Sequence, residues 1–155
     1  MIDERSRPRA GKARTPEAPD ALTISLMGSP ASAGLARTFA QQQLYKWGYL
    51  HILDDALLIT SELVANASEA TPGKELRYRI ERNAKGVLIS VWDSSPRVPT
   101  PKPLTEPTLE ALDHCEDTFD SGGGWGLPIV QALSAACGYT PHPTGGKWVW
   151  ARLVP

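Results

Sequence analysis

A pair of apolar segments separated by a short polar stretch constrains the fold of this chain most strongly. Residues Leu76–Ile80 alternate between apolar and polar side chains, and residues Val87–Trp92 are more continuously apolar. The segment Asn83–Gly86 between them has the composition of a hairpin turn. Strands joined by a hairpin run antiparallel. The sequence therefore favours an antiparallel or mixed sheet over a doubly wound parallel sheet.

Further strands and helices are predicted on both sides of this hairpin. Alternation at Leu22–Leu26 predicts a first strand, and Lys147–Leu153 is predicted to form the last one. Apolar residues at helical spacing predict helices at 29–48, 51–70 and 127–136. We therefore expect an α/β two-layer sandwich, in which a mixed, mostly antiparallel sheet is covered by helices on one face.

Several residues are expected to bound these helices or to lie in the core. Ser29 is predicted to cap the first helix and Gly48 to end it. Gly138 is predicted to close the third helix, whose apolar run places Cys137 in the core. Four tryptophans in strands or at helix ends are expected to be core or packing residues, not a binding stripe: Trp47, Trp92, Trp148 and Trp150.

Length and composition indicate one domain and exclude several function classes. The 155 residues suit a single core, and residues 1–20, rich in Pro and Arg, are expected to form a disordered tail before a domain at 21–155. The net charge of -1 gives no general attraction to nucleic acid or to anionic membranes. The chain has neither a membrane-length apolar run nor a recognisable signal peptide. With no Cys-x-x-Cys motif either, we expect a cytoplasmic protein without a zinc site.

The predicted helix at 51–70 carries a carboxylate and an amide four residues apart. Glu62 and Asn66 lie on one face of that helix. Their oxygen atoms suit a hard cation such as Mg²⁺ and the activation of an oxygen nucleophile. Taken alone, such a pair is more often two solvated residues on an amphipathic helix.

An aspartate follows the second hairpin strand at the end of the sheet, where ligands tend to bind. Asp93 begins the sequence Asp-Ser-Ser-Pro, and its carboxylate can accept a hydrogen bond from an exocyclic amino group such as that of adenine. Because Asp, Ser and Pro are common turn residues, a simple turn is the alternative interpretation.

A glycine-rich segment leads into the third predicted helix. Residues 122–127 read Gly-Gly-Gly-Trp-Gly-Leu, and glycines allow backbone N–H groups to approach phosphate oxygens at a helix N-terminus. A flexible hinge is the alternative. The other glycine pair, Gly145-Gly146, is not part of a Walker loop, because Lys147 is followed by Trp148 rather than Ser or Thr.

The stretch between these two segments, residues 94–123, is long for a connection inside a compact domain. It contains five prolines, and a short helix is predicted near Leu109–His114. Cys115 lies in this stretch and is expected to be a free thiol. Long connections of this kind are usually functional or mobile.

In this order and on these elements, four segments resemble the N box and the glycine boxes of the GHKL, or Bergerat-fold, ATPases. They read Glu-Leu-Val-Ala-Asn-Ala at 62–67, Asp-Ser-Ser-Pro-Arg at 93–97, Gly-Trp-Gly-Leu at 124–127 and Gly-Gly-Lys-Trp-Val-Trp at 145–150. The resemblance covers roughly residues 22–153. It is greatest to the small bacterial anti-sigma-factor serine/threonine kinases, and it implies a Bergerat ATP-binding fold with ATP and Mg²⁺ as cofactors.

The resemblance implies a role for each matching residue. Asn66 would bind Mg²⁺, Glu62 would act as the general base in phosphotransfer, and Asp93 would bind the adenine amino group. The segment between Ser94 and Gly123 would be the ATP lid. The remaining nucleotide-binding positions would be Ser95, Gly122, Gly124, Trp125, Gly126 and Leu127.

The function implied by the resemblance is that of a protein serine/threonine kinase that controls transcription by partner switching. Such a kinase phosphorylates an antagonist protein and sequesters a sigma factor, and it commonly forms homodimers. Glu69 and Ala70 stand where relatives often carry Arg-His. This departure favours an alternative, a catalytically weak ATP-binding module that regulates a partner through lid ordering. A structural domain without nucleotide is a third interpretation. None of these requires direct contact with nucleic acid or membrane.

Overall fold

The predicted hairpin forms the centre of the sheet. The computed structural model describes residues 19–97, 100–101, 119–120 and 127–155, and in it β2 (Glu75–Asn83) pairs antiparallel with β3 (Gly86–Asp93). Across the turn, the Asn83 side chain accepts a hydrogen bond from the backbone N–H of Lys85 at 2.8 Å. Gly86 has a φ of 125° and lies against the Leu153 carbonyl, where a Cβ atom would have no room.

Three further strands complete an antiparallel sheet with the order β1-β2-β3-β7-β6. Strand β1 (Ala21–Met27) pairs with β2, β7 (Lys147–Leu153) pairs with β3, and β6 (Ala136–Pro141) forms the edge beside β7. Two short strands, β4 (Thr100–Pro101) and β5 (Phe119–Asp120), pair separately. Every pairing among the described residues is antiparallel, which confirms the predicted α/β sandwich.

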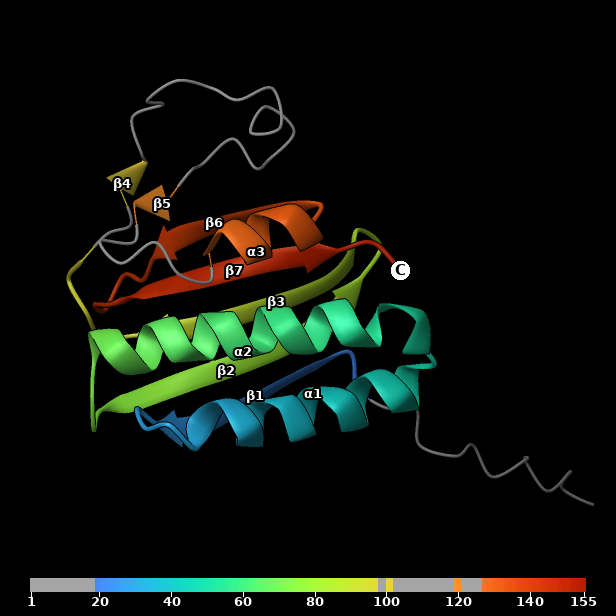
Figure 1. Ribbon diagram of the computed structural model, residues 1–155, viewed down its shortest axis with the longest axis horizontal. Coiled ribbons are helices and arrows are strands. Elements are labelled where there is room, and N and C mark those ends of the chain that lie inside the picture. The colour runs from blue at the N-terminus through green and yellow to red at the C-terminus, as the bar shows by residue number, and fades with distance from the viewer. Residues whose placement is uncertain (1–18, 98–99, 102–118, 121–126) are drawn as a thin grey trace, which may run out of the picture.

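The helices lie on one face of the sheet (Figure 1). Helix α1 (Ser32–Trp47) packs against α2 (Leu53–Ala70), and a 3-10 turn at Leu50–Ile52 joins them. Helix α3 (Leu127–Leu133) packs against the other side of α2. Among the helices in the described part of the chain, none is long and apolar enough to cross a bilayer.

The hydrophobic core lies between these helices and the inner face of the sheet. Alternate residues of the central strands are buried there: Leu76, Tyr78, Ile80, Val87, Ile89 and Val91. Helix α2 contributes Ile59, Leu63 and Val64 to the same core. Because strand side chains alternate between faces, the residues between these positions point away from the helices.

The predicted start of the first helix is wrong. Helix α1 begins at Ser32, and Ala31 occupies the N-cap position without a side-chain hydrogen bond. The carbonyl of Ser29 instead accepts a hydrogen bond from the N–H of Ser32 at 3.1 Å, so Ser29 belongs to a turn before the helix. Gly48 ends α1 as predicted, with a φ of 77°.

The third helix is shorter than predicted, and a strand follows it. Helix α3 ends at Leu133, so Gly138 lies within β6 rather than closing a helix. Gly138 packs against the indole of Trp150, which leaves no room for a Cβ atom. Cys137 is buried as predicted, although on β6. A short apolar run does not distinguish helix from strand, and here pairing with β7 decides.

The tryptophans do not share one environment. Trp47 is part of the core, as predicted, with 7% of its surface exposed. Trp92, Trp148 and Trp150 alternate with the inward residues of β3 and β7, so their half-buried indoles lie on the face without helices. The core interpretation is therefore wrong for these three residues.

Some predictions fall outside the described residues. These are the state of residues 1–18, the short helix near Leu109–His114 and the thiol of Cys115. The described end of the predicted tail contacts the domain: the carbonyl of Pro19 accepts a hydrogen bond from Trp47 Nε1 at 3.1 Å, and Asp20 forms an ion pair with Arg82 at 2.8 Å. The domain boundary near residue 20 stays a prediction.

A buried tyrosine makes the stability of this core sensitive to alkaline pH. The hydroxyl of Tyr78 lies 2.9 Å from that of Thr60, and burial raises the pKa of Tyr78 well above its ordinary value of 10.0. The unfolded tyrosine loses its proton near pH 10 while the folded one keeps it. The free energy of unfolding should therefore fall as the pH rises above 10, by up to about 1.4 kcal/mol per pH unit from this residue.

The variant Tyr78→Phe should lose this contribution. Urea denaturation of both proteins at several pH values between about 9 and 11 gives the free energy of unfolding at each pH. The contribution of Tyr78 is the difference between the two proteins in the slope of this free energy against pH. If the free energy of unfolding depended on pH equally in the two proteins, the pH dependence would not come from Tyr78.

Candidate functional site

The predicted site segments lie toward the same side of the domain. The C-terminal ends of α2 and β3 and the starts of α3 and β7 all point to the left in Figure 1. Helix α2 carries Glu62 and Asn66, β3 ends at Asp93, and α3 begins at Leu127. Segments that are distant in the sequence therefore approach one another at this end of the sheet.

The two predicted side chains on α2 differ in their surroundings. Glu62 is half-buried. Asn66 is also half-buried, but its Oδ1 atom is fully buried and has no hydrogen-bond partner among the described residues. A buried carbonyl oxygen left unpaired costs about 1–3 kcal/mol. The amide oxygen is a suitable ligand for a hard cation such as Mg²⁺, so the residue fits the role predicted for it.

Asp93 is a buried carboxylate held by two hydrogen bonds. It is the last residue of β3 and only 3% of its surface is exposed. Its Oδ1 atom accepts a hydrogen bond from the backbone N–H of Ser95 at 2.9 Å and another from Lys147 Nζ at 2.7 Å. Both contacts end on one oxygen, so Oδ2 has capacity to accept a further hydrogen bond.

Lys147 is a site residue that the sequence analysis did not assign. It is the first residue of β7, it lies directly opposite Asp93 in the β3–β7 pairing, and it is 6% exposed. One signal was available: alternation along β7 places Lys147 on the inner face together with Ala151 and Leu153. A lysine at an inward position requires an anionic partner, but the identity of that partner depends on the strand register.

The segment after Asp93 is shaped by two consecutive side-chain turns. Asp93 caps the N–H of Ser95, and the buried Ser95 uses its Oγ to accept a hydrogen bond from the N–H of Arg97 at 3.2 Å. The turn interpretation of this motif is thus correct as geometry. It does not exclude ligand binding, because the carboxylate is also fixed in place.

A second turn approaches the same strand end from β7. Gly146 has a φ of 73°, and a Cβ atom there would collide with the Asp93 carbonyl and the Trp92 indole. Trp92 Nε1 donates a hydrogen bond to the carbonyl of Gly145 at 3.2 Å. Glycine is therefore required at 146, and this close approach brings Lys147 level with Asp93.

The predicted phosphate-binding segment falls almost entirely outside the described residues. Gly122, Gly124, Trp125 and Gly126 belong to it, whereas Leu127 is the first residue of α3. Helix α3, which begins at Leu127, packs against α2, the helix that carries Asn66. The roles predicted for these glycines stay predictions.

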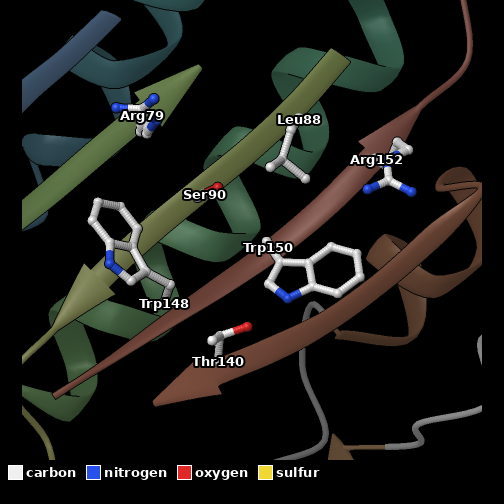
Figure 2. Close-up of a pocket in the computed structure, with 7 residues that line it drawn as sticks. All are labelled: Arg79, Leu88, Ser90, Thr140, Trp148, Trp150 and Arg152. Atoms are coloured by element: carbon white, nitrogen blue, oxygen red, sulfur yellow. The ribbon is translucent and has the colours of Figure 1, made fainter. Parts of the chain in front are cut away.

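A hollow of about 530 Å³ lies elsewhere, on the face of the sheet without helices (Figure 2). Ser90, Trp148 and Trp150 are among the residues that line it. Since Asp93 and Lys147 point to the opposite face, this hollow is separate from the site at the end of β3.

Comparison with known proteins agrees with this geometry. A family model described as the histidine kinase-like ATPase domain matches residues 28–153, which include α2, β3 and β7. No curated protein matches the chain.

Removal of one partner from the buried ion pair between Asp93 and Lys147 should destabilise the protein strongly. The variant Lys147→Met leaves Asp93 buried without its cation, and we expect a loss of about 3–5 kcal/mol in the free energy of unfolding. Urea denaturation measures this loss of unfolding free energy, and Lys85→Met in the exposed hairpin turn is the matched control. The double variant Asp93→Asn/Lys147→Met should recover most of the loss. A single variant as stable as the control would contradict the expectation.

Proposed function

Because the chain belongs to the histidine kinase-like ATPase family, we propose that it is an ATP- and Mg²⁺-binding regulator of the anti-sigma-factor kinase type. In this proposal it transfers phosphate from ATP to a serine or threonine of an antagonist protein and controls transcription by partner switching. The observation that carries the proposal is the orphaned, buried Oδ1 of Asn66, one turn from Glu62 on the helix that ends beside β3.

Asp93 is proposed to select the base of the nucleotide. Lys147 and the N–H of Ser95 hold its Oδ1 atom, and this orients the second oxygen as an acceptor. An exocyclic amino group, such as that of adenine, is the complementary donor. A buried acceptor discriminates strongly against a base that presents a carbonyl at the same position, since the two acceptors would face each other without a proton.

Asn66 is proposed to hold Mg²⁺. When bound, this ion would neutralise charge on the ATP phosphates, and Mg²⁺ in proteins commonly combines few protein ligands with phosphate oxygens. By binding Mg²⁺, the buried amide oxygen of Asn66 would gain the partner that it lacks in the protein alone. This gain favours the nucleotide-bound state of the protein.

Glu62 is proposed as the general base. It lies one helical turn before Asn66, so a hydroxyl near the metal-bound phosphates would lie within reach of its carboxylate. The hydroxyl oxygen of the substrate attacks the terminal phosphorus, the bond to ADP breaks, and Glu62 takes the hydroxyl proton. Backbone N–H groups from Gly124 to Leu127 are proposed to hold the phosphates.

A second candidate function is a binding module with little turnover. Glu69 and Ala70 are exposed at the end of α2, in the places where the resembled kinases often carry Arg-His. An acidic side chain there supplies no positive charge to the phosphates. In this case ATP binding would regulate a partner through ordering of the segment 94–123.

Under either function, we propose that the partner is a sigma factor or its antagonist. We also propose a homodimer and a cytoplasmic location.

Base selection by Asp93 predicts a preference for ATP over inosine triphosphate, which lacks the exocyclic amino group. We expect ATP with Mg²⁺ to bind about tenfold to a hundredfold more tightly in calorimetric titrations. The double variant Asp93→Asn/Lys147→Met leaves no unpaired buried charge and should lose most of this preference. If the wild-type protein bound neither nucleotide, the proposed function would be wrong. An unchanged preference in the variant would exclude Asp93 as the selecting residue.

Substitution of the proposed base separates the two candidate functions. With radiolabelled ATP and candidate antagonist domains, Glu62→Gln should lower phosphotransfer by about 10²–10⁴-fold and leave the Kd for ATP nearly unchanged. Asp55→Asn, a change to an exposed carboxylate at the other end of the same helix, is the matched control and should retain transfer. Absence of transfer in the wild-type protein, together with partner regulation that survives Glu62→Gln, would identify the binding module.

A further inference from the structure

The face of the sheet without helices carries a hollow lined by aromatic and cationic side chains (Figure 2). Ser90 lies near its centre, and Trp148, Trp150, Leu88 and Arg79 surround it. Ser90 stands directly opposite Trp150 in the β3–β7 pairing. The hollow exists because a small side chain occupies the middle of the sheet among much larger neighbours.

The charges on this face are unequally paired. Arg77 and Arg79 form ion pairs with Glu75 and Glu81, at 3.2 Å and 2.9 Å respectively. Arg152, which also lines the hollow, has no carboxylate partner among the described residues, and its Nε atom is buried without a hydrogen-bond partner there.

The guanidinium of Arg152 is held beside the aromatic wall of the hollow. It lies over the Trp150 ring, 5.9 Å from the ring centroid. The face therefore offers one unneutralised cation next to an apolar wall. A carboxylate is the group that completes a guanidinium in this position.

We propose that this face binds an extended, acidic segment of a partner protein. An apolar or aromatic side chain of that segment would fill the hollow over Ser90, between Trp148 and Trp150. A carboxylate of the same segment would pair with the guanidinium of Arg152 through its terminal nitrogens. The site accordingly recognises an acidic residue close in sequence to a large apolar one.

The charge pattern distinguishes this partner from two other occupants. Nucleic acid requires several free cations to neutralise its phosphates, and two of the three arginines on this face are already paired. A second copy would present the same face, whose carboxylates Glu75 and Glu81 are engaged with their own arginines. Only a segment with a carboxylate of its own complements Arg152. The inference does not rest on the proposed ATP site, which lies across the sheet.

The binding test uses a random copolymer of glutamate and tyrosine as the probe. Polyglutamate lacks the aromatic group, a lysine–tyrosine copolymer has the opposite charge, and poly(U) represents nucleic acid. In ¹⁵N-resolved NMR spectra, the indole signals of Trp148 and Trp150 should shift with the glutamate–tyrosine copolymer. The buried Trp47 serves as the internal reference and should not shift.

Two variants locate the contact. Ser90→Leu fills the hollow and Arg152→Gln removes the cation, and each should weaken binding of the copolymer by about tenfold. The matched control is Arg82→Gln, because Arg82 stacks on Trp47 and does not line the hollow. This variant should bind as the wild type does. Thermal melting and the unshifted signals of the buried core establish that each variant is folded.

Three results would overturn the proposal. One is an equal loss of binding in all three variants, which would indicate a general charge effect. Another is a shift of the two indole signals with poly(U) and not with the glutamate–tyrosine copolymer. The third is a stable dimer in analytical ultracentrifugation that Ser90→Leu dissociates, since the occupant would then be a second copy.

Discussion

The pairing register between β3 and β7 is the constraint on which both surfaces of this domain depend. It sets Asp93 opposite Lys147 on the inner face, and Ser90 opposite Trp150 on the outer face. Because strand side chains alternate with a period of two, a slip of one residue would move Lys147 to the outside and Trp148 into the core. The buried ion pair and the core residues of β7 exclude this slip, since each would be exposed by it.

Polar groups at this end of the sheet are of two kinds. Asp93, Lys147 and Ser95 satisfy one another, and their geometry is therefore fixed in the protein alone. The amide oxygen of Asn66 lacks a partner among the described residues. A fixed acceptor suits recognition of one chemical group, whereas an unpaired buried oxygen favours the state in which something binds it. In the proposed function, the fixed acceptor would bind the amino group of the base and the unpaired oxygen would bind the cation.

The sequence predicted those parts of the fold that short-range patterns determine. The hairpin, the long helix α2 and the last strand follow from alternation, helical spacing and turn residues, and the structure has them at nearly the predicted bounds. Strand β6 was missed because Ala136 and Cys137 continue the apolar run of the preceding helix, and only pairing with β7 assigns them to a strand. The cap of α1 was misassigned because Ser29 lies in the turn before the helix, where its side chain contacts the Ser32 hydroxyl and not a backbone N–H of the first turn.

The candidate site was predicted in the same uneven way. Glu62, Asn66 and Asp93 belong to motifs whose order in the sequence carries the signal. Lys147 became visible as a site residue only through the strand register, which links positions far apart in the chain. Trp92, Trp148 and Trp150 were wrongly predicted to lie in the core. Alternation places them on the opposite side of the sheet from the inward residues, but it does not show that helices cover only one side.

The connection between β3 and α3, residues 94–126, forms a loop whose ends are held by the packing of both elements against α2. Closing such a loop has an entropic cost that grows only with the logarithm of its length, by about 0.6 kcal/mol for each doubling. An insertion in this connection would therefore change the free energy of folding very little, provided that the turn at Asp93–Arg97 and the sheet stay intact. The length of this connection is thus nearly uncoupled from the stability of the scaffold, as in the binding loops of antibodies.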